Sequence, residues 1–136
     1  MPEKIKVALV GLGNCFSGLI QGIEYYSKNP SQKVTGIIHE NLRDYTIHDI
    51  EFVAGFDVGA NKVGKPINDA IYESPNMVNW IDKNDMPKAN GNVYESPALD
   101  GVGIWVENKV KPIESGKSES ELREEIIKVL KQTGTE

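Results

Sequence analysis

The sequence predicts an α/β fold with a parallel sheet, of which the first three strands and their helices are present. One observation is that apolar, strand-like segments alternate with segments whose apolar residues recur every three or four positions, as on one helix face. Another is that the first strand runs directly into Gly11-Leu12-Gly13, after which a helical pattern begins at once. The length of 136 residues fits a single domain.

The first strand is expected over residues 4–10. Its second half, from Val7 to Val10, is apolar without alternation, which is typical of a central parallel strand covered on both faces. In the helix that follows, the spacing predicts one buried face. That face consists of Phe16, Leu19, Ile20, Ile23 and Tyr26.

Two further strands are expected, over residues 51–58 and 92–95, with an irregular stretch over 28–49 before the first of them. Between these strands a short helix begins at Pro66, a residue that suits a first helical position. Its inner face consists of Ile67, Ala70 and Ile71. Residues 98–117 are either a strand or a packed loop, and the sequence leaves both open.

The last helix begins with Ser118 and Glu121, spaced as in a capping box, and ends near Gly134. Its core face consists of Leu122, Ile126, Val129 and Leu130. A crossover helix with no strand after it indicates an incomplete α/β unit. Residues 1–136 are therefore interpreted as the front part of a longer protein.

Composition narrows the range of partners and compartments. The net charge is −5 and no basic block occurs, which argues against a nucleic-acid partner. The apolar runs are too short to span a membrane, and the first residues lack the pattern of a signal peptide. Cys15 is the only cysteine, so no internal disulfide forms. These features favour the cytoplasm.

The turn after the first strand has the chemistry of a dinucleotide site of the Rossmann type. The N-terminus of a helix offers free amide groups and partial positive charge to a diphosphate. Gly11 would allow the tight turn and Gly13 the close approach, while Asn14 and Ser17 could add side-chain donors. The general motif has a third glycine or alanine where this chain has Phe16. A strand–helix turn without a ligand is the alternative.

Asp57 ends the second strand, where an acidic residue accepts hydrogen bonds from the adenosine ribose in such folds. A carboxylate there repels a 2′-phosphate and so favours NAD over NADP, and the nearest cation is Lys62. The distance from the glycines far exceeds the usual spacing of about 20 residues, so the intervening segment must loop out. The alternative role of Asp57 is to form a turn at the strand end.

The remaining candidate residues give weaker indications of a metal-binding, catalytic or cofactor-binding role. His39 and His48 match no compact metal motif, and no metal site is expected. Cys15 is interpreted as a small residue beside the cofactor rather than a nucleophile, because no partner base is visible. Asp100 lies in a loop that would face the cofactor cleft. The predicted cofactor-binding residues are Gly11, Gly13, Asn14, Cys15, Phe16, Ser17, Asp57 and Asp100; no catalytic residue is predicted.

Several segments together resemble the prokaryotic branch of myo-inositol-1-phosphate synthase, also called inositol-3-phosphate synthase. The most specific is Gly-Asn-Cys at residues 13–15 followed by Gln-Gly-Ile-Glu-Tyr-Tyr at residues 21–26. Further likeness lies at residues 36–40, 45–49, 51–54, 56–58, 62–64 and 99–101. The resemblance also accounts for the long segment before Asp57, since the family carries an insertion there.

This resemblance implies an NAD-dependent isomerase that converts glucose 6-phosphate to myo-inositol 3-phosphate by oxidation, aldol cyclisation and re-reduction. It implies that residues 1–136 are the truncated N-terminal NAD-binding domain and that the catalytic and oligomerisation domain is absent. The catalytic lysines would lie in that later domain, so that glucose 6-phosphate binds only with it. The resemblance also implies a homo-oligomer, with a tetramer expected. This chain alone is expected to bind NAD weakly, without turnover. It departs from the family at Phe16 and Pro66. A non-catalytic NAD-binding module and the domain of an ordinary NAD dehydrogenase are the alternatives.

Overall fold

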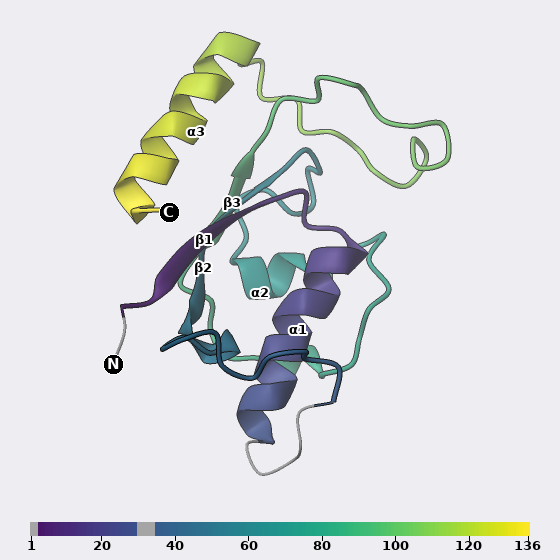
Figure 1. Ribbon diagram of the computed structural model, residues 1–136. Coiled ribbons are helices and arrows are strands. Elements are labelled where there is room, and N and C mark those ends of the chain that lie inside the picture. Colours follow the sequence, from purple (N-terminus) through teal and green to yellow (C-terminus); the bar gives the residue numbers. More distant parts are fainter. Residues whose placement is uncertain (1–2, 30–34) are drawn as a thin grey trace.

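A computed structural model describes residues 3–29 and 35–136 of the chain, and its centre is an open parallel sheet (Figure 1). The strands are β1 (Ile5–Val10), β2 (Ile50–Asp57) and β3 (Asn92–Glu95), in the order β1-β2-β3. Both pairs of neighbours are parallel. The α/β class and the parallel sheet predicted from the sequence are confirmed.

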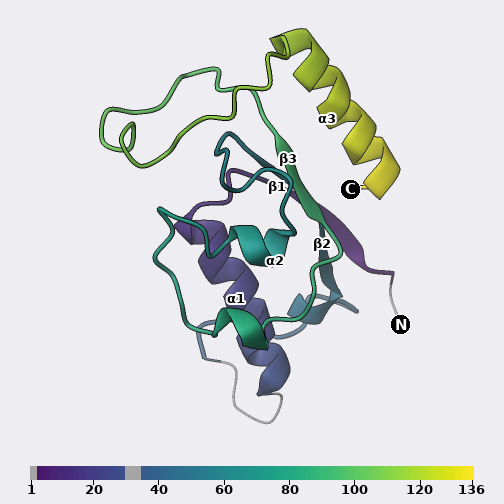
Figure 2. The same ribbon diagram turned by 180° about the vertical axis from the view of Figure 1, so that it is seen from behind.

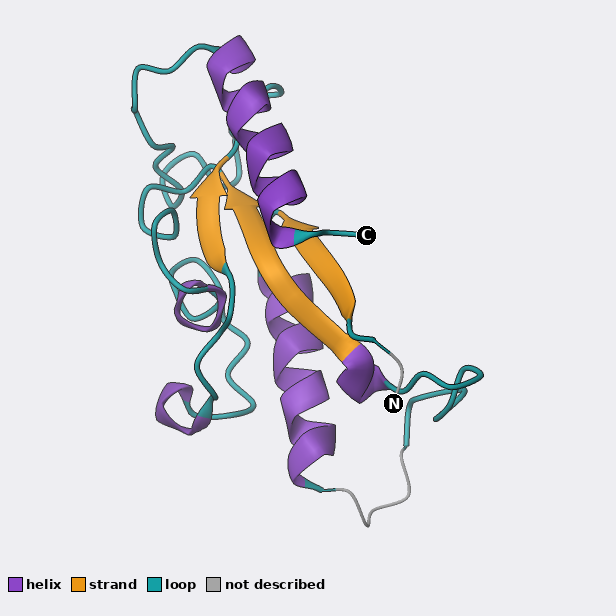
Figure 3. Ribbon diagram, turned by 90° about the vertical axis from the view of Figure 1, so that its left-hand side faces the viewer, coloured by secondary structure: helices purple, strands orange, loops and turns teal. Residues whose placement is uncertain are grey.

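The helices cover the two faces of this sheet. Helix α1 (Asn14–Lys28) and the short α2 (Ile67–Ala70) lie on one face, and α3 (Glu119–Thr133) lies on the other (Figures 2 and 3). Two single 3₁₀ turns, at Ile47–Asp49 and Lys83–Asp85, complete the helical segments. The sheet is thus buried between two layers, as the unbroken apolar pattern of the first strand predicts.

Each face of the sheet has its own apolar cluster. The larger lies under α1 and α2 and consists of Leu9, Leu12, Ile20, Ile67, Ala70, Ile71 and Val93. The smaller lies under α3 and consists of Ala54, Phe56 and Val129, with Ala8, Ile126 and Leu130 packed against it. Burial of these side chains supplies the main driving force for folding, at roughly 25 cal/mol for each Å² of apolar surface removed from water.

A register shift in β2 explains how one strand contributes side chains to both apolar clusters. Val7 pairs with Phe52 while the next residue, Ala8, pairs with Ala54, so β2 contains one extra residue at this point. An extra residue reverses the alternation of side chains. Phe52 therefore packs with the cluster under α1, whereas Ala54 packs with the cluster under α3.

Several expected details are corrected. Leu19 was expected on the buried face of α1 but is 45% exposed. Pro66 precedes α2 as its cap rather than opening it, and turns replace the helix after Ala70. The inner face expected there is present, because Ile67, Ala70 and Ile71 are fully buried. The expected irregular stretch over 28–49 includes residues 30–34, which lie outside the described residues.

Residues 98–117 are neither a strand nor a packed loop. They belong to a long excursion between β3 and α3 that projects from the rest of the chain (Figure 1). Trp105 is 87% exposed, and Leu99 and Ile104 are also largely exposed. Both expectations for this segment rested on its apolar residues being buried, and they are not.

The predicted ends of α3 are confirmed. Ser118 and Glu121 form a reciprocal capping box, and Gly134 takes the left-handed conformation at the C-cap, with φ of 65°. This turn brings the chain back to the sheet, where the Glu136 N–H donates to the carbonyl of Lys6 on the outer side of β1. At the opposite edge, β3 exchanges backbone hydrogen bonds with Gly64 and Lys65 through Val93.

Candidate functional site

The glycine loop joins β1 to α1 at the carboxyl end of the sheet. Gly11 has φ of +78°, a conformation that favours glycine, and its N–H donates to the carbonyl of Phe56 at 2.8 Å. Gly13 is the N-cap of α1 and makes no side-chain cap. Between them, the side chain of Leu12 is completely buried and lies against Gly55, where a Cβ would come within 2.9 Å of it. The loop is thus anchored in the core through Leu12.

Side chains from two other segments hold the backbone of Leu12. Its N–H donates to Oδ2 of Asp57 at 2.8 Å. Its carbonyl accepts from Nζ of Lys62 at 2.7 Å and from Nδ2 of Asn76 at 2.9 Å. Both polar groups of one residue are therefore fixed by residues that are distant in sequence but adjacent at this end of the sheet.

Lys62 has a side chain that is only 7% exposed. Burial disfavours the charged ammonium and lowers the pKa of Lys62, an effect that the carboxylates of Asp57 and Glu73 oppose. The Nζ atom lies 3.9 Å from Oδ2 of Asp57 and also donates to Oδ1 of Asn76 at 3.2 Å. A lysine so deeply buried is rare unless its charge is paired, as it is here.

Asp57 lies beside the glycine loop, as its predicted role requires despite the long intervening sequence. It is 9% exposed, and its carboxylate faces the loop, where Oδ2 accepts from Leu12. The other oxygen, Oδ1, accepts from the N–H of Gly59 at 2.8 Å. Asp57 therefore forms a turn at the strand end, which is one of the two roles weighed from the sequence, and it lies beside the glycine loop, which is the position that the ribose-binding role requires.

Asn14 and Ser17 both bond to the segment that follows α2. Oδ1 of Asn14 accepts from the N–H of Met77 at 2.7 Å. The hydroxyl of Ser17 is fully buried and donates to the carbonyl of Ile71 at 2.8 Å. Asn14 is exposed at the start of α1, whereas Ser17 lies beneath it and supports the helix from within.

The other three residues of the predicted site differ in their surroundings. Phe16 is half-buried and packs against the apolar cluster under α1, and Cys15 is exposed at the first turn of that helix. Asp100 is exposed in the excursion after β3, and no hydrogen bond joins it to the glycine loop among the residues that the structure describes. Among the described residues, the structure thus joins Asp57 to the loop by a hydrogen bond and shows no such bond from Asp100.

The sequence missed Lys62 and Asn76 as members of this site. Lys62 was noted only as the nearest cation to Asp57, and Asn76 was given no role in the site. The one available signal was polarity, because both side chains follow closely on apolar segments of the sequence. Which backbone atom they would hold depends on the fold of the loop and could not be read from spacing.

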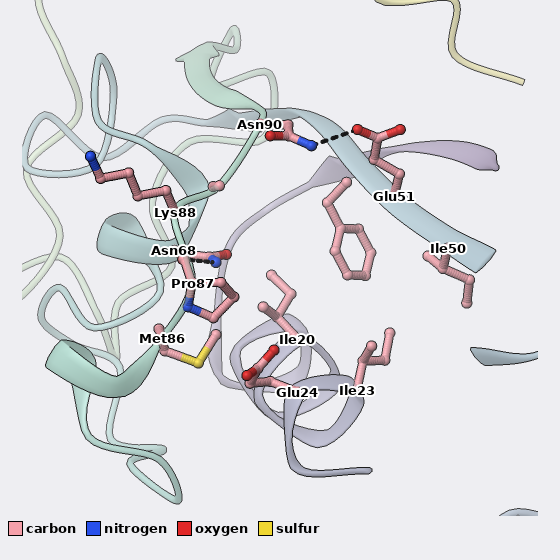
Figure 4. A pocket seen from close by; sticks show the side chains of 12 residues that line it. Ile20, Ile23, Glu24, Ile50, Glu51, Asn68, Met86, Pro87, Lys88 and Asn90 are labelled. Atoms are coloured by element: carbon pink, nitrogen blue, oxygen red, sulfur yellow. Dashed lines mark hydrogen bonds between the residues drawn. The ribbon is translucent and has the colours of Figure 1, made fainter. Parts of the chain in front are cut away.

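A separate hollow lies at the other end of the sheet, between α1 and the start of β2 (Figure 4). Ile20 and Ile23 line it from the helix, and Met86 and Pro87 line it from the segment before β3. At its rim, Nδ2 of Asn90 donates to Glu51 at 2.7 Å. This hollow is remote from the glycine loop and contains none of the predicted site residues.

The two histidines do not lie in a metal-binding arrangement. Nδ1 of His48 lies 3.0 Å from the hydroxyl of Ser27, and His39 is exposed. Within residues 3–29 and 35–136, no three histidine, cysteine or acidic side chains gather closely enough to hold an ion. In the same ranges, no helix has the length and apolar character needed to cross a membrane.

Comparison with known proteins places this site in a family context. The chain is 48% identical over 100 residues to an inositol-3-phosphate synthase of Corynebacterium glutamicum, which covers 73% of this chain and 27% of that protein. It is 38% identical over 130 residues to an inositol-3-phosphate synthase of Mycolicibacterium smegmatis, covering 95% and 34%. No family model matches the chain.

The fold is also found in a solved structure. A myo-inositol-1-phosphate synthase-related protein of Thermotoga maritima superimposes with a TM-score of 0.72 at 19% identity, over 96% of this chain and 32% of that one. At this identity the likeness supports the fold alone. The sequence matches show that the chain is a homologue of inositol-3-phosphate synthases, and it spans about a third of the length of these relatives.

Proposed function

We propose that this homologue of inositol-3-phosphate synthases binds NAD at the glycine loop and forms the NAD-binding portion of such an enzyme. The observation that carries the proposal is the loop itself. Gly13 leads into a helix of 15 residues whose first amides have no partner within the helix, and the loop backbone is already fixed by buried side chains. A helix start of this kind favours a diphosphate.

The residues divide into two groups around the proposed ligand. The diphosphate would lie against Gly13 and the amides of Asn14 and Cys15, with Phe16 completing the first turn. The adenosine ribose would lie against Asp57, whose Oδ1 accepts one protein hydrogen bond and retains a second lone pair for a hydroxyl. Gly11 and Ser17 support this surface from below, and Asp100 would approach it only from the excursion after β3.

The charge at the ribose end favours NAD over NADP. A 2′-phosphate would approach the carboxylate of Asp57, and like charges at short range repel. The nearest cation, Lys62, is buried and already donates to Leu12 and Asn76, so its ammonium is not available to bind a 2′-phosphate. We therefore expect discrimination against NADP to be an intrinsic property of this portion of the protein.

For the complete enzyme we propose the isomerisation of glucose 6-phosphate to myo-inositol 3-phosphate. NAD would supply an acceptor for a hydride from the sugar and return the hydride later, so that no net oxidation occurs. The present residues would bind and orient the cofactor. The chain alone would bind NAD weakly and without turnover, since the family resemblance implies catalytic lysines in a later domain. The same resemblance implies a homo-oligomer, and the composition of the chain favours the cytoplasm.

The sharpest test is Gly13→Ala. Gly13 has φ of −85°, which any residue adopts, and a Cβ built there meets no atom within 4 Å. We expect the unfolding free energy to change by less than about 0.5 kcal/mol. The methyl group would occupy the space proposed for the diphosphate, so we expect NAD affinity to fall at least about tenfold, or about 1.4 kcal/mol.

Gly22→Ala is the matched control, because Gly22 lies in the same helix and a Cβ there also meets nothing within 4 Å. It should leave NAD affinity unchanged and stabilise the helix by about 0.5–1 kcal/mol. Isothermal titration with NAD and NADP completes the test. Equal affinity for the two dinucleotides, or no effect of Gly13→Ala on NAD binding, would contradict the proposal.

A further inference from the structure

The peptide bond between Leu12 and Gly13 has its two ends in different surroundings. On one side, the carbonyl of Leu12 accepts hydrogen bonds from Lys62 and Asn76 in the interior. The bond is trans, and in a planar trans peptide the N–H points opposite to the carbonyl. The N–H of Gly13 is therefore directed away from these side chains, and it has no hydrogen-bond partner among the described residues.

Holding this carbonyl is costly for the protein. A buried ammonium loses its hydration, and burial lowers the pKa of Lys62 accordingly. Replacing a buried ion pair as a whole with apolar groups of similar volume often leaves stability unchanged or improved. The arrangement is thus poorly explained by stability alone, and its distinctive effect is to fix the orientation of one peptide group in the glycine loop.

Asn76 reinforces the same orientation from a second direction. Its Nδ2 donates to the carbonyls of both Leu12 and Ile71 at 2.9 Å, and its Oδ1 accepts from Lys62. The amide of Asn76 therefore links the loop, the lysine and the C-cap of α2 at Ile71. Rotation of the Leu12–Gly13 peptide would break two hydrogen bonds to Leu12 and leave the Lys62 ammonium underpaired.

We propose that Lys62, assisted by Asn76, is a positioning residue that aims the Gly13 N–H at the diphosphate of the bound dinucleotide by fixing the Leu12 carbonyl on the opposite side of the peptide. This inference rests on the proposed function. Lys62 touches no part of the ligand in this arrangement and acts only through the peptide. The diphosphate then meets an amide that is already oriented, so that binding costs less conformational entropy.

The test compares Lys62→Met with Lys65→Met. Methionine keeps the length and apolar stem of lysine but cannot donate a hydrogen bond. Lys65 is the matched control, because it lies three residues away and pairs with Glu73 at 2.7 Å rather than with the loop. We expect Lys62→Met to weaken binding of NAD and ADP-ribose at least about tenfold and Lys65→Met to change it less than about twofold, and titration calorimetry measures both.

The readout that separates positioning from mere structural damage is adenosine, which has no phosphate. Its affinity, followed by NMR titration, should change less than about twofold in Lys62→Met, whereas damage to the fold would weaken adenosine and NAD alike. Lys62→Arg, which keeps the charge and the donors, should recover part of the NAD affinity. Equal losses for adenosine and NAD, or unchanged NAD affinity in folded Lys62→Met, would overturn the inference.

Two further measurements keep the inference separable from the proposed function. If Lys62→Met does not fold, Asn76→Ala removes one of the two donors to Leu12 and should show the same selective loss on a smaller scale. If the unaltered chain binds no NAD, the proposed function fails. The amide resonance of Gly13 then decides the orientation itself, since it should shift in Lys62→Met and remain in place in Lys65→Met; no difference between them would refute the positioning role.

Discussion

Two loops of this protein follow the carboxyl ends of parallel strands, and they differ in how they are held. The glycine loop after β1 is short, and its central residue, Leu12, is fully buried with both backbone groups bonded. The excursion after β3 is long and carries Trp105 exposed to solvent. The first loop is held by buried polar side chains from other segments, whereas the second exposes apolar side chains of its own.

The difference lies in where each loop finds its partners. The stem of the excursion is tied to the turn after β2 by bonds from Ile113 to Val58 and from Ala60 to Lys111. The backbone hydrogen bonds found within residues 103–110 are local turns between residues of that segment. The glycine loop instead bonds to segments far along the chain. Long-range polar contacts therefore fix the glycine loop more firmly than the excursion. We expect matched substitutions to lower the unfolding free energy more in the glycine loop.

The largest loss of unfolding free energy is expected for Asp57→Ala. This change leaves the N–H groups of Leu12 and Gly59 without their acceptor and the buried ammonium of Lys62 without its counter-charge. Removing one partner of a buried, hydrogen-bonded charge pair costs about 3–5 kcal/mol. Urea unfolding followed by circular dichroism measures the loss. Asp57→Asn should lose less stability, because the carbonyl oxygen of asparagine still accepts a hydrogen bond. A loss below about 1 kcal/mol for Asp57→Ala would show that these contacts do not fix the glycine loop.

A second prediction sharpens this comparison by using two glycines with similar φ angles, one in each loop. Gly11 has φ of +78° and Gly101, in the excursion, has φ of +71°, and neither has an atom within 4 Å of an added Cβ. Gly11→Ala should destabilise by about 1–2 kcal/mol, because the fixed loop cannot relax out of the left-handed region. Gly101→Ala should cost less than about 0.5 kcal/mol. Equal losses in thermal unfolding would show that the two loops are equally constrained.

The smallest effect concerns the point where the excursion ends and α3 begins. The N–H and hydroxyl of Ser118 bond to Glu121 and lower the pKa of that carboxyl below its ordinary value of 4.5. The contribution of the ionised Glu121 carboxylate to stability is therefore fully present above pH 4.5, and it is lost as the pH falls through the lowered pKa of the folded state. The difference in unfolding free energy between the unaltered chain and Glu121→Gln should shrink from pH 7 to pH 3; an unchanged difference would contradict this assignment.

The predictions from sequence succeeded where a local pattern decides the structure. The third strand was predicted at its observed bounds, and the capping box of α3 follows from the spacing of Ser118 and Glu121. The inner face of α2 was likewise correct, since Ile67 and Ala70 are fully buried. In each case the determining residues lie within a few positions of one another, where spacing and chemistry suffice.

The failures concern contacts that only the complete fold creates. Leu19 fits the helical period of α1 as well as Ile20 does, yet the layer against that helix covers only Ile20. Trp105 and Ile104 have strand-like side chains, but they are 87% and 72% exposed, so the described part of the chain does not cover them. The role of Lys62 depends on which carbonyl lies within reach of its ammonium, and that carbonyl belongs to a residue 50 positions earlier in the chain.

The two edges of the sheet differ in how far their backbone groups are already hydrogen-bonded. Outside β3, Val93 is already bonded to Gly64 and Lys65, so that border is occupied by the chain's own backbone. Outside β1, the described residues supply a single bond, from Glu136 to Lys6, and the side chain of Val10 is 72% exposed. A strand that presents free backbone groups is a template for another strand. Enlargement of this sheet, by whatever segment, therefore has only one available direction, and added strands would accumulate beside β1.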